Sequence, residues 1–193
     1  SGDMVWVAGL ADNGSIDGYS GATALGIAAL EGMNGINSNF SWGQTFFGQI
    51  PGSIGETSTF LILLAGAYMV YTKIASWRII FGTLAGMIVM SSALNLIGSD
   101  TNPMFAIPWY WHLTIGSFAF GLVYMATEPV SAANTNMGRW IYGISIGVIV
   151  VLIRVINPAF PEGMMLAILF ANLLAPAIDF TITSLNTSRR MER

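Results

Sequence analysis

The sequence of 193 residues contains no cysteine and only one histidine, His112. Without cysteine the chain cannot form a disulfide, ligate an iron–sulfur cluster through thiolates or use a thiol nucleophile. A single histidine argues against a zinc site built from this chain alone. That histidine also lies inside an apolar stretch, so a Ser-His-Asp triad has no support.

Charged residues are scarce as well. They make up 9% of the chain, whereas 54% of the residues are hydrophobic, and the mean hydropathy is +0.65. A soluble domain has roughly 25% charged residues. So few charges cannot cover a surface that faces water, so we expect membrane lipid to cover much of it. The net charge of −3 without a basic patch argues against a nucleic-acid partner.

Five apolar stretches follow one another in the second part of the chain, at 57–72, 78–98, 105–127, 139–157 and 163–184. A membrane-spanning helix needs about 20 residues, and the first stretch is short. Pro103 and Pro108 at the start of the third stretch predict a broken or kinked helix there. We therefore predict an all-α integral membrane protein with about five transmembrane helices in residues 56–185.

Two of these stretches carry pairs of glycines at a spacing of four residues. They are Gly82 with Gly86 and Gly143 with Gly147. Small residues at this spacing let membrane helices approach closely, so we expect ordinary helix packing at these positions.

Residues 1–55 are rich in Gly, Ser, Asn and Asp and contain no piece long enough to span a bilayer. They predict an irregular segment outside the membrane. The chain begins Ser1-Gly2-Asp3-Met4, which has neither the features of a signal peptide nor an initiator methionine. We therefore expect a piece of a longer protein.

The positive charges predict the orientation in the membrane. With five spans, Lys73, Arg78, Arg139 and the three arginines of the tail 186–193 fall on one side, and only Arg154 falls on the other. Cytoplasmic loops carry the excess of Lys and Arg. We therefore expect a cytoplasmic basic tail and an outward-facing segment 1–55.

The exposed segment contains the most informative motif, Asp17-Gly18-Tyr19-Ser20-Gly21-Ala22-Thr23, followed by an apolar run suited to one short helix. Ser20 is a plausible N-cap, which would place Thr23 at the third helical position. A helix N-terminus binds phosphate readily, so a phosphate ester of the Thr23 hydroxyl could be held there. The alternative is that Ser20 only caps the helix and Thr23 is a surface residue.

The motif Asp-x-x-Ser-Gly-Ala-Thr matches the site at which a flavin transferase attaches FMN to threonine, here Thr23, with Asp17, Ser20, Gly21 and Ala22 completing the motif. Further matching motifs lie at 51–56, 74–80, 98–102, 108–113 and 157–165. Together they resemble the NqrB family, a membrane subunit of sodium-translocating NADH:quinone oxidoreductases. The resemblance spans nearly the whole chain and covers the C-terminal half of a ten-helix protein, the other half being a partner of this one.

The resemblance implies a membrane subunit of a respiratory sodium pump in the bacterial inner membrane, with residues 1–55 in the periplasm. It implies covalent FMN at Thr23 that relays electrons toward quinone, coupled to Na⁺ movement. Riboflavin and ubiquinone are possible further ligands of the full-length protein. The other subunits of the complex, which receive electrons from NADH, would be partners. No residue is assigned a catalytic role.

Two carboxylates near the ends of spans are candidates for a Na⁺ pathway, namely Asp179 and Glu128. Ionisable residues inside a membrane are often functional, and Pro176 should free a backbone carbonyl near Asp179. The hydroxyls of Thr181 and Thr183 would add oxygen ligands. By the resemblance, acidic residues at both positions are linked to sodium handling. Alternatively, either carboxylate is an interfacial residue paired with an arginine of the tail.

Two further groups of residues have two interpretations each. Trp109 and His112 lie in an aromatic cluster that is typical of an interfacial belt, or they form a wall against the flavin ring. Glu56 complements the dipole of the helix that follows it, and the turn 52–56 could also shape a flavin pocket.

Two other functions stay open. The first is RnfD, a component of the related Rnf ferredoxin:NAD⁺ complex, which shares the flavin motif. The second belongs to another class, a passive ion channel or transporter component in which Thr23 is unmodified.

Overall fold

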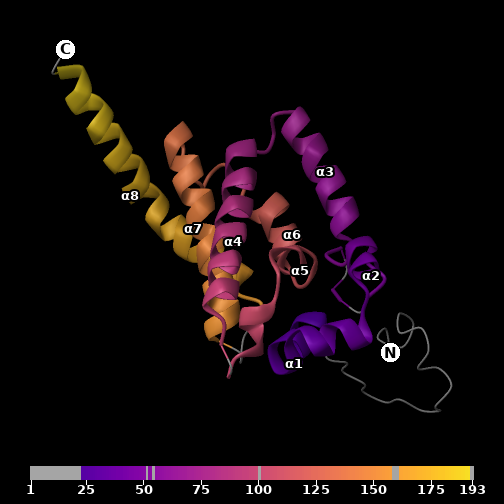
Figure 1. Ribbon diagram of the computed structural model, residues 1–193. Coiled ribbons are helices and arrows are strands. Elements are labelled where there is room, and N and C mark those ends of the chain that lie inside the picture. The colour runs from indigo at the N-terminus through magenta and orange to yellow at the C-terminus, as the bar shows by residue number, and fades with distance from the viewer. Residues whose placement is uncertain (1–22, 51, 54, 100, 158–160, 192–193) are drawn as a thin grey trace.

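The computed structural model describes residues 23–50, 52–53, 55–99, 101–157 and 161–191. In these ranges every regular element is helical, which confirms the predicted all-α class. Figure 1 shows a group of helices running between two ends of the molecule, with α1 (Ala24–Asn39) lying across the end opposite the C-terminus. The short helix α2 (Trp42–Phe47) connects α1 to the rest.

Among the described residues, three helices are long and apolar enough to cross a membrane: α4 (Trp77–Ile97), α7 (Asn136–Ile156) and α8 (Met164–Met191), the last over Met164–Ser188. The first predicted stretch forms α3 (Thr59–Tyr71), an apolar helix of only 13 residues. The third stretch is broken. The five predicted stretches therefore all have helical counterparts, but only three of them are long continuous helices.

The third stretch breaks at two places rather than one. The helix η3 (Pro103–Ala106) is separate from α5 (Trp109–Thr114), as the two prolines predict. A second break follows α5, where Ile115 is extended and Gly116 has φ of +69°. The chain then continues as α6 (Phe118–Phe120) and a π-helical turn η4 (Gly121–Met125). Only glycine adopts a positive φ without steric cost, so Gly116 permits this second break.

Helices α4 and α7 pack closely against each other through the four glycines noted above. A Cβ atom at Gly143 would lie 2.7 Å from the carbonyl oxygen of Ile79, and one at Gly82 would lie 3.1 Å from that of Trp140. A Cβ at Gly147 would overlap the Thr83 carbonyl. The glycine pairs therefore allow backbone-to-backbone packing, as predicted.

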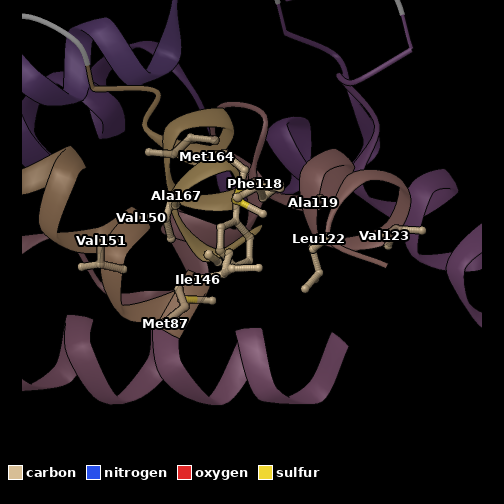
Figure 2. Packing of buried hydrophobic residues seen from close by; sticks show 14 of the residues in the cluster. Met87, Phe118, Ala119, Leu122, Val123, Ile146, Val150, Val151, Met164 and Ala167 are labelled. Atoms are coloured by element: carbon tan, nitrogen blue, oxygen red, sulfur yellow. The ribbon is translucent and has the colours of Figure 1, made fainter. Parts of the chain in front are cut away.

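The apolar core lies where α4, α7, α8 and the broken segment meet (Figure 2). Met87 of α4 and Ile146 of α7 are fully buried, as are Phe118 at the start of α6 and Ala167 of α8. The broken segment is thus enclosed by the longer helices. Irregular backbone at membrane depth survives where protein buries it or where it lines a cavity.

Helix α1 begins later than the motif predicts, and this corrects the proposed cap. Its first residue is Ala24, and Thr23 itself is the N-cap, with φ −68° and ψ 155°. Thr23 is therefore not the third helical residue, and the predicted cap, Ser20, lies outside the described residues. A threonine side chain caps a helix nearly as well as a serine does, and the apolar run favours a start directly after it. Asp17, Ser20, Gly21 and Ala22 lie outside the described residues.

Candidate functional site

Thr23 stands at the N-terminus of α1 with an exposed side chain. Its hydroxyl oxygen accepts a hydrogen bond from the N–H of Gly26 at 3.1 Å. The N–H groups of Ala24 and Leu25 have no acceptor within the helix because they belong to its first turn. The first turn also contains no acidic residue. The position therefore combines an exposed hydroxyl with donors that favour an anion.

A cavity of about 530 Å³ opens beside Thr23. Small-molecule sites in proteins are typically about 300–1,000 Å³. One wall is the turn before α3, another is the break after α5, and a third comes from the residues that precede α8. The lining residues are Thr23, Ala24, Leu25, Ile50, Gly52, Ser53, Glu56, Thr57, Thr114, Gly116 and Glu162.

The structure thus brings the motif residue Thr23 together with the turn that contains Gly52, Ser53 and Glu56. Sequence analysis already offers both the Thr23 motif and this turn as parts of a flavin pocket. Thr114, Gly116 and Glu162 are lining residues that were not predicted. The signals for two of them were present, since Gly116 interrupts an apolar stretch and Glu162 belongs to one of the matching motifs.

Arg154 was also missed, because in the sequence it counts only as a charge on the outward side. It lies at the C-terminal end of α7 and is fully buried. Its Nη1 donates to the carbonyl of His112 at 2.8 Å, and its Nη2 donates to that of Ile115 at 3.1 Å. Arg154 thereby binds carbonyls at the end of α5, which lose their helical partners at the break.

Glu162 holds the other side of the same break. Its Oε2 accepts hydrogen bonds from the N–H of Ser117 at 3.2 Å and from the Ser117 hydroxyl at 2.9 Å. Its backbone carbonyl accepts from Nε of Arg154 at 3.4 Å. A cation and an anion together replace the missing helical hydrogen bonds around Gly116.

Trp109 and His112 do not line this cavity. Trp109 is 42% exposed and packs edge-on against Tyr110. His112 is buried, and its Nδ1 has no hydrogen-bond partner among the described residues. Their role in a flavin site therefore stays a prediction.

Glu128 lies in the loop after η4, half-buried. Its carboxylate accepts from the hydroxyl of Ser131 at 2.5 Å, from the N–H of Ser131 at 2.8 Å and from the N–H of Val130 at 3.1 Å. The hydrogen bond from the Ser131 side chain, followed by those from the two backbone groups, lowers the pKa of Glu128 from its ordinary value of 4.5. Glu128 therefore stabilises a turn as an ionised carboxylate.

Asp179 joins α8 to the start of α7. Its Oδ2 accepts from the N–H of Asn134 at 2.6 Å, and its Oδ1 accepts from the N–H of Thr135 at 3.0 Å and from the Thr135 hydroxyl at 2.7 Å. The hydroxyls of Thr181 and Thr183 donate to carbonyls of their own helix, those of Ala177 and Asp179. The carboxylate oxygens of Asp179 thus already accept hydrogen bonds in this conformation, whereas the two threonine hydroxyls act as donors and keep their oxygen lone pairs.

No group of three His, Cys, Asp or Glu side chains within the described ranges is close enough to hold a metal ion. A monovalent cation bound by one carboxylate with carbonyl and hydroxyl oxygens would not require such a group.

Sequence comparisons place these features among known proteins. A profile of the NQR2, RnfD, RnfE family matches residues 2–187. The NqrB protein of the Na(+)-translocating NADH-quinone reductase from Azotobacter vinelandii is 60% identical over the whole chain, which covers 46% of that protein. The proteins of the same name from Ectopseudomonas mendocina and Neisseria meningitidis serogroup B are 59% and 56% identical, again over the whole chain, with 46% and 47% of their own lengths covered. The chain spans about half the length of the curated relatives it matches.

Proposed function

The chain belongs to the NQR2, RnfD, RnfE family, and on this premise we propose that it is the C-terminal half of the NqrB protein of a sodium-translocating NADH-quinone reductase and carries covalent FMN on Thr23. The observation that carries the proposal is the position of Thr23, at a helix N-terminus and on the wall of a cavity of about 530 Å³. The identity of 54–60% to proteins of that name supports the choice of complex over the Rnf alternative.

The residues around Thr23 fit a flavin joined through its phosphate. A phosphate on the Thr23 oxygen would lie beside the N–H groups of the first turn of α1, which also carries the positive end of the helix dipole. The residues that line the cavity include Thr57, which carries a hydroxyl, and Gly52 and Gly116, which present only backbone groups. These are the kinds of polar group that orient a flavin ring by hydrogen bonds.

The flavin would supply electron transfer, and the protein would supply position and local charge. Attachment through phosphate leaves the ring itself free of covalent bonds to the chain. A flavin transferase would form the bond, and the other subunits of the complex, the N-terminal half of the NqrB protein, quinone and lipid would be its partners in the membrane. Riboflavin and ubiquinone remain candidates for the full-length protein.

We further propose an orientation in the bacterial inner membrane with the Thr23 cavity on the periplasmic side. Helix α1 lies at the end opposite the C-terminus in Figure 1, and the tail carries positive charge. Arg154 is the one cation that counted against this orientation, but it is fully buried and bound to carbonyls. A buried arginine is not a loop charge, so it does not weaken the positive-inside argument.

Asp179 and Glu128 remain our candidates for the Na⁺ pathway. Each carboxylate lies next to hydroxyl and backbone groups at the end of the molecule where α7 begins. Na⁺ binding to either would require the carboxylate to exchange hydrogen-bond donors for the cation. Such an exchange would couple the binding of the ion to movement of α8 or of the loop before α7.

A fluorescence comparison of two threonine variants tests the flavin proposal. In cells with an active flavin transferase, Thr23→Val should abolish the covalent flavin fluorescence of the denatured protein on a gel. Thr57→Val is the matched control, because it removes a hydroxyl from the same cavity without touching the proposed attachment point, and it should retain the fluorescence. Fluorescence that survives Thr23→Val would favour a channel or transporter function, or attachment elsewhere.

A further inference from the structure

The wall of the Thr23 cavity contains two opposite charges that the proposed function does not yet use. Gly116 lines the cavity, and a Cβ atom built on it would lie 2.9 Å from Oε2 of Glu162 and 3.0 Å from Nη2 of Arg154. The carboxylate and the guanidinium therefore both lie next to the same cavity residue, Gly116. Glu162 lines the cavity directly, whereas Arg154 does not line it but lies beside Gly116.

Arg154 adds a positive charge that hydrogen bonding to the freed carbonyls does not itself require. Three of its N–H groups serve the carbonyls of His112, Ile115 and Glu162, and its guanidinium carbon lies 5.8 Å from the centre of the Phe118 ring. Freed carbonyls at a helix break are commonly served by neutral groups such as hydroxyls or water. A fully buried charge in a membrane segment is costly by comparison.

The electrostatic effect of this pair on a group in the cavity has a definite sign. In a poorly polarisable interior, charges act over several ångströms with little screening. Addition of an electron to a bound group adds negative charge, which a nearby cation stabilises and a nearby anion destabilises. Arg154 should thus raise the affinity of the cavity occupant for electrons, and Glu162 should lower it.

We infer that Arg154 and Glu162 are positioning residues that hold the broken third segment against the Thr23 cavity and, through their opposite charges, set the redox midpoint of the flavin bound there. This inference rests on the proposed function, because it requires the flavin on Thr23. The helix break would then tune electron transfer through the charges of Arg154 and Glu162.

The test is a redox titration of the purified complex that contains the full-length NqrB protein. Each variant is made with and without Thr23→Val, and the difference spectrum isolates the flavin on Thr23. Arg154→Gln should move its midpoint to a more negative potential, and Glu162→Gln should move it to a more positive one. We expect at least a tenfold change in the one-electron equilibrium in each case, which corresponds to about 59 mV.

Arg154→Lys separates charge from geometry. Lysine keeps the positive charge but cannot bridge several carbonyls as the planar guanidinium does, so its midpoint should stay nearer the wild type than that of Arg154→Gln. If Arg154→Gln does not assemble, the lysine and Glu162→Gln variants still decide the question. A Glu162→Gln midpoint that does not move, or that moves in the negative direction, would overturn the inference.

The two proposals fail in distinguishable ways. If Thr23→Val removes no flavin from the complex, the proposed function is wrong and the inference falls with it. If Thr23→Val removes the flavin but the Arg154 and Glu162 variants leave its midpoint unchanged, only the inference is wrong.

Discussion

Asp179 on α8 accepts hydrogen bonds from both the N–H and the hydroxyl of Thr135, the residue that caps the start of α7. Asp179, a candidate residue of the sodium pathway, thus also connects α8 to α7 by hydrogen bonds. Because the Asp179 carboxylate lies where α7 and α8 meet, a change in its hydrogen bonds would alter the position of both helices. The two roles of Asp179 can be separated by experiment.

Asp179→Asn should lower the thermal midpoint of the complex. The substitution removes the charge that accepts three hydrogen bonds, and a hydrogen bond to a charged group contributes about 1.5–3 kcal/mol. Thr181→Val is the control, since the Thr181 hydroxyl bonds only to a carbonyl of its own helix, and it should leave the midpoint nearly unchanged. Stimulation of electron transfer by Na⁺ is measured on the same samples. Unchanged stimulation in Asp179→Asn would remove Asp179 from the ion pathway.

Gly147→Ala should destabilise the protein by about 1–3 kcal/mol or more, because overpacking of a tight contact costs this much. A Cβ there would lie 2.6 Å from the Met87 nitrogen and would overlap the Thr83 carbonyl, which forces α4 and α7 apart. Gly43→Ala in α2 meets no atom within 4 Å and serves as control. Thermal unfolding followed by tryptophan fluorescence compares the two. Equal midpoints would contradict the close helix contact.

Gly116→Ala should reduce the amount of flavin retained as well as stability. Its φ of +69° strains any other residue, and the new Cβ would press on Leu25, Glu162 and Arg154. Gly98→Ala carries a similar strain at φ +64° but opens into free space. A non-glycine residue held at such a positive φ costs about 1–3 kcal/mol at either position. A larger loss of retained flavin and stability in Gly116→Ala than in Gly98→Ala would therefore show that Gly116 matters as part of the cavity wall. Equal losses in the two variants would argue against this role.

The turn held by Glu128 should respond to acid. Its pKa is lowered, first by the Ser131 hydroxyl, so its contribution to stability is full above the ordinary value of 4.5 and is lost as the pH falls through the lower folded value. Ser131→Ala removes the largest cause and should shift this loss to higher pH. Thermal midpoints measured across the acidic range test the expectation. Identical pH profiles for the two proteins would show that the hydrogen bond does not control the Glu128 pKa.

The all-α membrane fold could be predicted because composition and apolar length depend on local sequence alone. The close packing of α4 and α7 was predictable for the same reason, because glycines four residues apart in each helix can be read directly from the sequence. The break at Gly116 was not predicted, because its stability depends on Arg154 and Glu162, 38 and 46 positions farther along the chain. Only the fold brings these three residues together.

The start of α1 was placed three residues too early for a different reason. Ser20 and Thr23 are both good caps, and the local sequence does not choose between them. In the structure, Thr23 is the N-cap of α1. This correction changes the chemistry of the proposal, since it puts the hydroxyl at the end of the helix, where the first-turn N–H groups can meet a phosphate.

The most direct test of the account is mass spectrometry of the peptide that contains Thr23, taken from the protein expressed with an active flavin transferase. The account predicts an FMN phosphoester on Thr23 and none on Ser20 or Thr57. A peptide in which Thr23 is unmodified, from cells whose transferase modifies another substrate, would contradict it.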